Sequence, residues 1–189
     1  MAIISTFELL VKPQLPKKAP IGPQIPSKAL KLSRNVILGY FLTLANLSSS
    51  DFECQLLFTI RLPEGRTVGE LIGIIDTSGS DRPFKLDPIG EDQFGSTVLL
   101  PPKSTSLIIL QPDFVNFQNL LESLDFEVRG FVEIRRTAVS LTLPPVTIIA
   151  TPENRGTFFS NLDGSTPDEI GLDQIAYSLP IRNGGFLEV

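Results

Sequence analysis

The chain has 189 residues, a net charge of −5 and 42% hydrophobic residues, which is the balance of a globular protein with one large domain or two small ones. It contains no histidine, and this excludes Ser-His-Asp and Cys-His catalytic arrangements and most catalytic zinc sites. Its single cysteine, Cys54, excludes an intrachain disulfide and fits a reducing compartment. The 16 prolines disfavour long helices, because an interior proline removes a donor and clashes with the preceding turn.

The N-terminal stretch MAIISTFELLVKPQL lacks the basic start, the long apolar run and the small-residue cleavage site of a signal peptide. No window reaches the ~18 consecutive apolar residues that a membrane-spanning helix needs. We therefore expect a soluble cytoplasmic protein that does not insert into membranes.

Charge is distributed unevenly along the chain. Residues 1–35 hold six basic residues and one acidic residue, a net charge of +5, whereas the remainder holds 10 basic and 20 acidic residues, a net charge of −10. An acidic body disfavours nucleic acid, which is bound mostly through its phosphates. A basic segment on an acidic body can instead contact its own body or a neighbouring copy.

The first 34 residues are predicted to form a strand followed by an arm. Residues 2–11 are apolar enough for a strand, and residues 12–28 carry five prolines and four lysines, which predicts an extended arm without helix. Pro13 and Pro16, followed by Lys17 and Lys18, have the PxxP form that SH3-type grooves accept. A stiff tether is the favoured interpretation of this run, because PxxP arises easily wherever proline is abundant.

The body, residues 35–189, is predicted to be a single domain that opens with three strands in an antiparallel meander. These strands are expected within 35–47, 51–62 and 66–76, separated by turn sequences. In the second strand Cys54 shares a face with alternating apolar residues, so we expect a buried, unreactive thiol.

The rest of the body is predicted to alternate short strands with polar loops. We expect long loops at 77–95 (with one short strand near 84–86) and 151–171, one short helix within 112–124 capped by Asp113, and strands at 96–101, 104–110, 126–136, 137–145, 146–150, 174–181 and 186–189. The dipeptide Asn183-Gly184 predicts a tight hairpin between the last two strands, because both positions suit positive φ angles.

These elements predict an all-β fold. About nine or ten short strands at this spacing are typical of a two-sheet antiparallel β-sandwich, either immunoglobulin-like or jelly-roll, with a proline-rich N-terminal arm and at most one short helix. The Cys-Trp-Cys signature of antibody domains is absent, so "immunoglobulin-like" refers to architecture only.

No catalytic or cofactor motif is visible. The phosphate-binding GxxxxGK[ST], the dinucleotide-binding GxGxxG and the serine-nucleophile GxSxG and SxxK patterns are all missing, so we expect no enzyme activity and no cofactor. The acidic loops do not have the spacing of a calcium-binding loop, and we expect solvated carboxylates rather than a metal site. Asn46-Leu47-Ser48 matches the N-glycosylation pattern, which we interpret as chance.

The stretch FEVRGFVEIRR, residues 126–136, has one apolar face and one charged face. On the charged face Phe131 lies between Arg129 and Arg135, a combination that is enriched at the centres of protein interfaces. The alternative is a solvated surface on which charges of alternating sign offset one another. We predict a partner-binding surface at Phe131, Arg129 and Arg135, with Pro13, Pro16, Lys17 and Lys18 of the arm as its counterpart.

Three functions follow from these patterns. The favoured one is a non-catalytic structural or protein-interaction β-sandwich that assembles as a homo-oligomer through its N-terminal arm. The second is a ligand-binding module that uses the loops 77–95 and 151–171 at one end of the sandwich. The third is an enzyme that uses loop carboxylates, for which the sequence singles out no pair.

Overall fold

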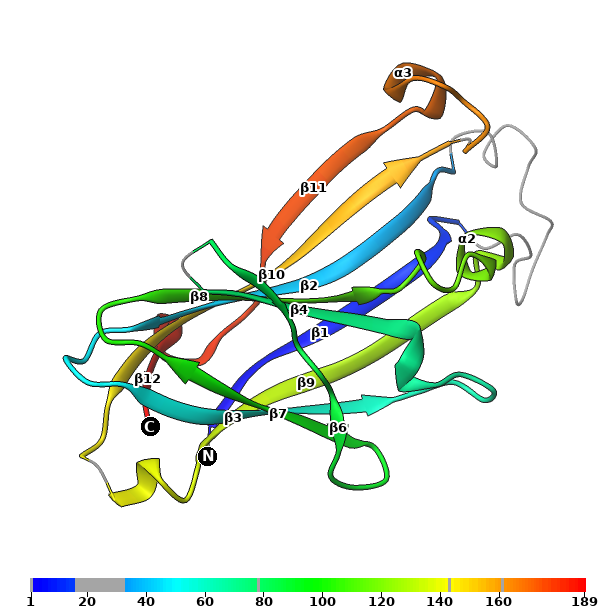
Figure 1. Cartoon of the computed structure of the whole chain (residues 1–189). Coiled ribbons are helices and arrows are strands. Elements are labelled where there is room, and N and C mark those ends of the chain that lie inside the picture. Colours follow the sequence, from blue (N-terminus) through cyan, green and yellow to red (C-terminus); the bar gives the residue numbers. More distant parts are fainter. Residues whose placement is uncertain (1, 16–32, 78, 143, 161) are drawn as a thin grey trace.

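The computed structural model describes residues 2–15, 33–77, 79–142, 144–160 and 162–189, which form one curled antiparallel sheet (Figure 1). The strands are β1 (Ala2–Pro13), β2 (Asn35–Asn46), β3 (Phe52–Arg61), β4 (Leu71–Thr77), β5 (Asp81–Pro83), β6 (Asp87–Pro88), β7 (Gln93–Leu100), β8 (Thr105–Pro112), β9 (Phe126–Arg136), β10 (Thr147–Phe159), β11 (Asp173–Ser178) and β12 (Phe186–Glu188). The helical turns are η1 (Val68–Glu70), α2 (Asn119–Ser123), η2 (Ser140–Thr142), α3 (Pro167–Ile170) and η3 (Arg182–Gly185). None of these described helices is long and apolar enough to cross a membrane.

The sheet branches at β2. One edge of β2 pairs with β10 along the whole strand, from Asn35↔Phe159 to Asn46↔Ile148. The other edge pairs with β1 over residues 35–38 and with β8 over residues 40–45, so Gly39 marks the change of partner. Beyond this branch the sheet continues as β1-β9-β3-β7-β6 on one side and β8-β4-β5 on the other.

Strands of both branches contribute to the larger hydrophobic cluster of the chain. Phe7 of β1 lies 5.2 Å from Tyr40 of β2 between ring centroids, and Phe58 of β3 lies 5.8 Å from Phe84, which follows β5. The all-β prediction is therefore confirmed as an antiparallel sheet with a shared core.

The predicted alternation in β3 is confirmed. Cys54 is fully buried together with the other residues on its face, Phe52, Leu56, Phe58 and Ile60. The expectation of a buried thiol therefore holds, and burial raises the pKa of the Cys54 thiol to about 12.

The predicted meander is wrong. The second, third and fourth strands do not pair with one another, because β2 pairs with β1, β8 and β10, β3 with β7 and β9, and β4 with β5 and β8. The turn sequences end these strands, but each following strand pairs elsewhere in the sheet. Asn46 stabilises the turn that follows β2, because its side-chain amide donates to the backbone carbonyls of Ser50, Leu100 and Pro101. This buried, fully engaged side chain is the asparagine of the glycosylation pattern.

The predicted loop 151–171 is wrong in its first half, because β10 continues to Phe159. Pro152 is tolerated inside the strand because its ring nitrogen points toward the edge of β10 at the place where β11 has ended and β12 has not yet begun. There its carbonyl accepts a hydrogen bond from the backbone N–H of Leu179 (2.9 Å), so only one bond of the pair is lost.

The predicted strand at 137–145 is also wrong. The hydroxyl of Thr137 accepts from the N–H of Ser140 (3.4 Å), and the N–H of Leu141 donates to the Thr137 carbonyl (3.0 Å). These local bonds form a turn, and Val139 and Leu141 are exposed.

The Asn-Gly hairpin is a fourth correction. Asn183 and Gly184 have positive φ angles of 53° and 61°, as expected, but β11 and β12 do not pair with each other. Both pair antiparallel with β10, one after the other along the same edge. The dipeptide determines the local backbone conformation but does not determine which strand β12 pairs with.

The expectation of at most one short helix is likewise corrected. Besides α2, where Asp113 caps the preceding turn through the N–H of Asn116 (3.1 Å), the chain forms the single turn α3. The hydroxyl of Thr166 accepts from the N–H of Glu169 (3.3 Å) at its start, and Pro167 follows the cap.

Candidate functional site

The charged face of residues 126–136 is engaged by β1. The guanidinium of Arg129 donates to the carboxylate of Glu8 (2.8 Å) and contacts that of Glu127 (2.6 Å). Glu127 also pairs with Lys12, at the end of β1. These ion pairs join β1 to β9 within one chain.

This network displaces the pKa values of two of its members. The hydrogen bond from Lys12 lowers the pKa of Glu127 below its ordinary value of 4.5. The hydrogen bond to Glu8 raises the pKa of Arg129 above its already high ordinary value. Both ions are stabilised by partners in the same chain, so this face already has internal counter-charges.

Phe131 is half-buried, between Thr6 of β1 and Thr59 of β3. Arg135 donates to the side-chain oxygen of Gln55 (2.6 Å). Pro13 is the last residue of β1, beyond the Val11↔Phe126 pair, whereas Phe131 pairs with Thr6 further back along the strand, so Pro13 does not cover Phe131. Pro16, Lys17 and Lys18 lie outside the described residues, and their predicted role stays a prediction.

The two loops proposed for ligand binding do not meet. Thr77, at the start of the first loop, pairs with Ser106, which pairs with Leu44 near the end of β2. The second loop follows Phe159, which pairs with Asn35 at the start of β2. The loops therefore lie at opposite ends of β2 (Figure 1). Among the described residues no three carboxylate or cysteine side chains are grouped to hold a metal ion.

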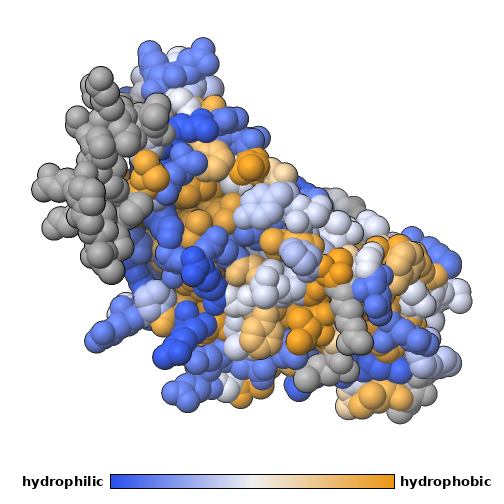
Figure 2. Space-filling view, turned by 180° about the vertical axis from the view of Figure 1, so that it is seen from behind, coloured by the Kyte–Doolittle hydropathy of each residue, from blue (hydrophilic) through white to orange (hydrophobic). Residues whose placement is uncertain are grey.

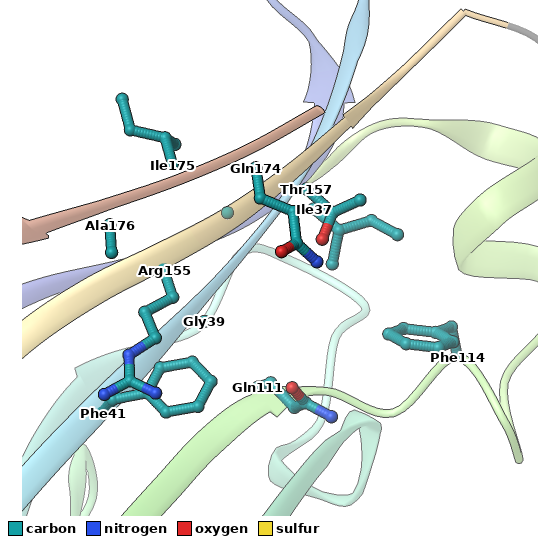
Figure 3. Close-up of a pocket in the computed structure, with 11 residues that line it drawn as sticks. Ile37, Gly39, Phe41, Gln111, Phe114, Arg155, Thr157, Gln174, Ile175 and Ala176 are labelled. Atoms are coloured by element: carbon teal, nitrogen blue, oxygen red, sulfur yellow. The ribbon is translucent and has the colours of Figure 1, made fainter. Parts of the chain in front are cut away.

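A groove lies instead on the strand face of β2, β10 and β11. It encloses about 670 Å³, and its walls combine apolar side chains with a few polar groups: Ile37, Gly39, Phe41, Gln111, Phe114, Arg155, Gly156, Thr157, Gln174, Ile175 and Ala176. Figure 3 shows the side-chain amides of Gln111 and Gln174 lying between Phe41 and Phe114. Apart from Phe114, the residues that line this groove belong to strands.

Arg155 is held in place on the groove wall. Its guanidinium lies 4.5 Å from the centroid of the Phe41 ring and donates to the carboxylate of Glu153 (2.8 Å). The charge of Arg155 is therefore matched by Glu153, and the groove offers amide and hydroxyl groups as its remaining polar contacts.

The strand β11, which forms one rim of the groove, is an open edge of the sheet. All six of its residues are exposed, and β10 is its only strand partner among the described residues. Ile175 and Tyr177 each keep 43% of their surface accessible on the face opposite Gln174 and Ala176.

The backbone groups of β11 that point away from β10 can be identified from the register. Leu179 donates to Pro152, so this pair and the alternate pairs Tyr177↔Asn154 and Ile175↔Gly156 are the hydrogen-bonded ones. The intervening residues Gln174, Ala176 and Ser178 therefore direct their N–H and C=O groups to the open edge.

The side chain of Tyr177 is positioned by Asn154 on β10. The amide of Asn154 donates to the Tyr177 hydroxyl (3.4 Å) and to the backbone carbonyl of Glu8 (3.2 Å), linking β11 to β1. Figure 2 shows hydrophobic and hydrophilic side chains mixed over the back of the molecule, so its exposed apolar residues form local patches rather than one continuous face.

Sequence reasoning found the strand within 174–181 but missed its role as an edge. The alternation of Ile175 and Tyr177 was visible, whereas the expected hairpin gave this strand the wrong neighbour. Comparison with known proteins finds no matching family model, no similar curated protein and no similar solved structure.

Proposed function

We propose that this chain is a non-catalytic structural protein that assembles with copies of itself through its sheet. The observation that carries the proposal is the open edge of β11, with six exposed residues and two exposed apolar side chains. An unpaired strand edge is a template for another strand unless charged side chains or proline block it. β11 contains neither lysine, arginine nor proline, and its single charge, Asp173, lies at its first residue.

The ionisable groups of the core support a non-catalytic role. Burial raises the pKa of the Cys54 thiol to about 12 and the pKa of the Tyr40 hydroxyl further above its ordinary value. Both groups are neutral at physiological pH and lie inside the core, where they pack rather than react.

Two routes lead to self-assembly. In the first, copies join at the β11 edge. In the second, expected from the sequence, the N-terminal strand is exchanged between copies. β1 is a central strand between β2 and β9, so exchange would transfer a core strand across the linker 14–34. We also propose that the two branches of the sheet are the layers of a sandwich, with residues 16–32 as an extended arm.

The oligomeric mass in solution tests the proposal. We expect the chain to exceed its monomer mass of 20.7 kDa in sedimentation equilibrium at micromolar concentration. Ala176→Pro should return it to a monomer with an unchanged circular dichroism spectrum, because the lost N–H points away from β10.

A second variant separates the two routes. Replacing residues 16–32 by a short Gly-Ser turn would block exchange of β1 and leave the β11 edge intact. Association that survives this replacement and is lost in Ala176→Pro identifies the edge. A parent chain that stays monomeric up to millimolar concentration would overturn the proposed function.

A further inference from the structure

The geometry points to a specific joint: two copies pair antiparallel through β11, with a two-fold axis at Ala176. This inference rests on the proposed self-assembly and adds its partner surface and register. It follows from which backbone groups face the open edge and from which side chains the pairing would bring together.

The backbone of β11 is self-complementary in this register. Gln174, Ala176 and Ser178 direct their N–H and C=O groups outward, as the Leu179–Pro152 hydrogen bond establishes. With the axis at Ala176, this residue pairs with its own copy and Gln174 pairs with Ser178 of the second copy. Every outward donor then meets an outward acceptor, and the sheet continues across the joint.

The side chains on one face of the joint are complementary as well. Ile175 lies opposite Tyr177 of the second copy in this register, and the pairing occurs twice because of the two-fold symmetry. Aromatic and β-branched residues opposite each other are a stabilising cross-strand pair. These four side chains are the ones that remain 43% accessible in the single chain. Asn154 fixes the Tyr177 hydroxyl beside them (3.4 Å).

Charge does not oppose the joint. Asp173 is the only charged residue of the strand, and it lies at the end away from the axis, where Arg34 pairs with it (3.2 Å). Ala176 and Ser178 are small, so the face that carries the groove also closes without a clash. Since each copy has a net charge of −5, the joint should tighten as salt screens the repulsion between the bodies.

The joint would place two grooves on one side of a continuous sheet. A two-fold axis between antiparallel strands is perpendicular to the sheet and keeps equivalent faces on the same side. Gln174 and Ala176 line the groove from β11, so the second copy's residues 174–178 would extend its rim.

Cysteine cross-linking tests the register directly, because the native Cys54 is buried and does not compete. In an antiparallel hydrogen-bonded pair the Cα atoms are about 5.5 Å apart, within the range that a disulfide bridges. We expect Ala176→Cys to form a covalent dimer under mild oxidation of the full-length chain, as seen by non-reducing electrophoresis.

Two single variants serve as matched controls. Gln174→Cys and Ser178→Cys each lie about 13 Å from their own copy in this register, too far for a disulfide. Neither should cross-link alone, and their equimolar mixture should. Cross-linking of either control alone would overturn the register at Ala176.

These measurements distinguish an error in the proposed β11 joint from an error in the proposed self-assembly. If the parent chain associates but Ala176→Cys does not cross-link, the joint is wrong and the proposed function stands. If the chain does not associate, both are wrong. Ile175→Lys provides an independent check: it should weaken association at least tenfold without changing the melting temperature of the monomer, and unaltered association would contradict the joint.

Discussion

Gly130 shows how tightly the branch formed by β1, β9 and β3 is packed. A β-carbon at this position would lie 2.3 Å from the carbonyl oxygen of Thr59 and 2.6 Å from the ring of Phe7. Neither a strand backbone nor a buried ring moves easily, so the glycine is required by close approach rather than by a turn.

Gly130→Ala should therefore destabilise the protein by about 1–3 kcal/mol, the usual cost of overpacking. The measurement is urea unfolding followed by circular dichroism. Gly90→Ala is the matched control, because its added β-carbon meets nothing closer than 3.7 Å and should change stability little. Equal effects of the two substitutions would show that the Phe7 ring can shift.

The hydrogen bond between Ser5 of β1 and Tyr40 of β2 joins these two strands inside the core (2.9 Å). Ser5→Ala should cost about 1–3 kcal/mol, because the Tyr40 hydroxyl loses this partner in a buried position. The double variant Ser5→Ala/Tyr40→Phe should regain part of the loss. Additive losses in the double-mutant cycle would argue against coupling between these hydroxyls.

Cys54 should be protected from thiol reagents in the folded protein. Burial raises its pKa to about 12, so at pH 8 the thiol is both inaccessible and almost entirely protonated. Labelling with a chromogenic disulfide reagent should be slow in native buffer and complete in denaturant. Rapid native labelling would place residues 52–60 in the opposite register.

The elements β1 and β9 are connected on their outer face by the ion pairs Lys12–Glu127 and Glu8–Arg129. The pKa of Glu127 lies below 4.5 in the folded chain, so its contribution to stability is present above pH 4.5. It is lost as the pH falls through the lower folded value. Because the pair is partly exposed, the contribution is small, ~0–1 kcal/mol.

We therefore expect the contribution of the Lys12–Glu127 ion pair to the free energy of unfolding to be constant above pH 5 and to decrease below pH 4.5. Glu127→Gln should make the acid limb shallower when melting temperature is followed from pH 7 to pH 3. Glu122→Gln, in the exposed part of α2, is the control that should leave the limb unchanged. If the melting temperatures of the parent and of Glu127→Gln fall equally steeply below pH 4.5, this ion pair does not contribute to stability.

At the scale of elements the sequence predicted strands better than it predicted their partners. Sequence patterns identified β2, β3, β7, β8 and β9, and in β3 and β9 one buried face imposes a period of two. Strand pairing depends on residues that are far apart in the sequence. β3 pairs with β9 and β10 pairs with β2, and no local sequence pattern predicts these partners. Pro152 shows the same limit, since only the break between β12 and β11 makes a proline acceptable there.

The candidate site was predictable to a smaller extent for the same reason. The charged face around Arg129 was visible as an alternation, but Glu8 and Lys12 of β1 supply its counter-ions from a distant segment. The groove brings together residues of β2, β8, β10 and β11 that share no sequence motif. An open edge is a property of the assembled sheet, so it could not be read from residues 173–178 alone.

For the whole molecule, the position of β1 determines what removal of the N-terminus would do. β1 pairs with β2 and β9, and Ile4, Leu9 and Val11 are buried in the core. The division of the sequence into residues 1–34 and a body of 35–189 implies that the body folds without its N-terminus. The structure predicts instead that a chain without residues 2–13 loses cooperative thermal unfolding, as measured by circular dichroism.

Shortening the linker is the control for this deletion. The backbone N–H of Gln14 donates to the carbonyl of Arg34 (2.8 Å), so the two ends of residues 15–33 are already adjacent. Replacing residues 16–32 by a short Gly-Ser turn should preserve the fold. A folded chain without β1, or an unfolded chain with the short turn, would contradict this account.

The branch at β2 also has a consequence for biosynthesis. One full edge of β2 is completed only by β10, which is more than 100 residues further along the chain. A nascent chain on the ribosome therefore carries β2 with that edge unmatched until most of the protein has emerged, and such long-range closure is slow. A polypeptide terminated near residue 145 would retain this exposed edge permanently. We expect it to be captured by chaperones or to form inclusion bodies, whereas the complete chain folds once β10 has been released.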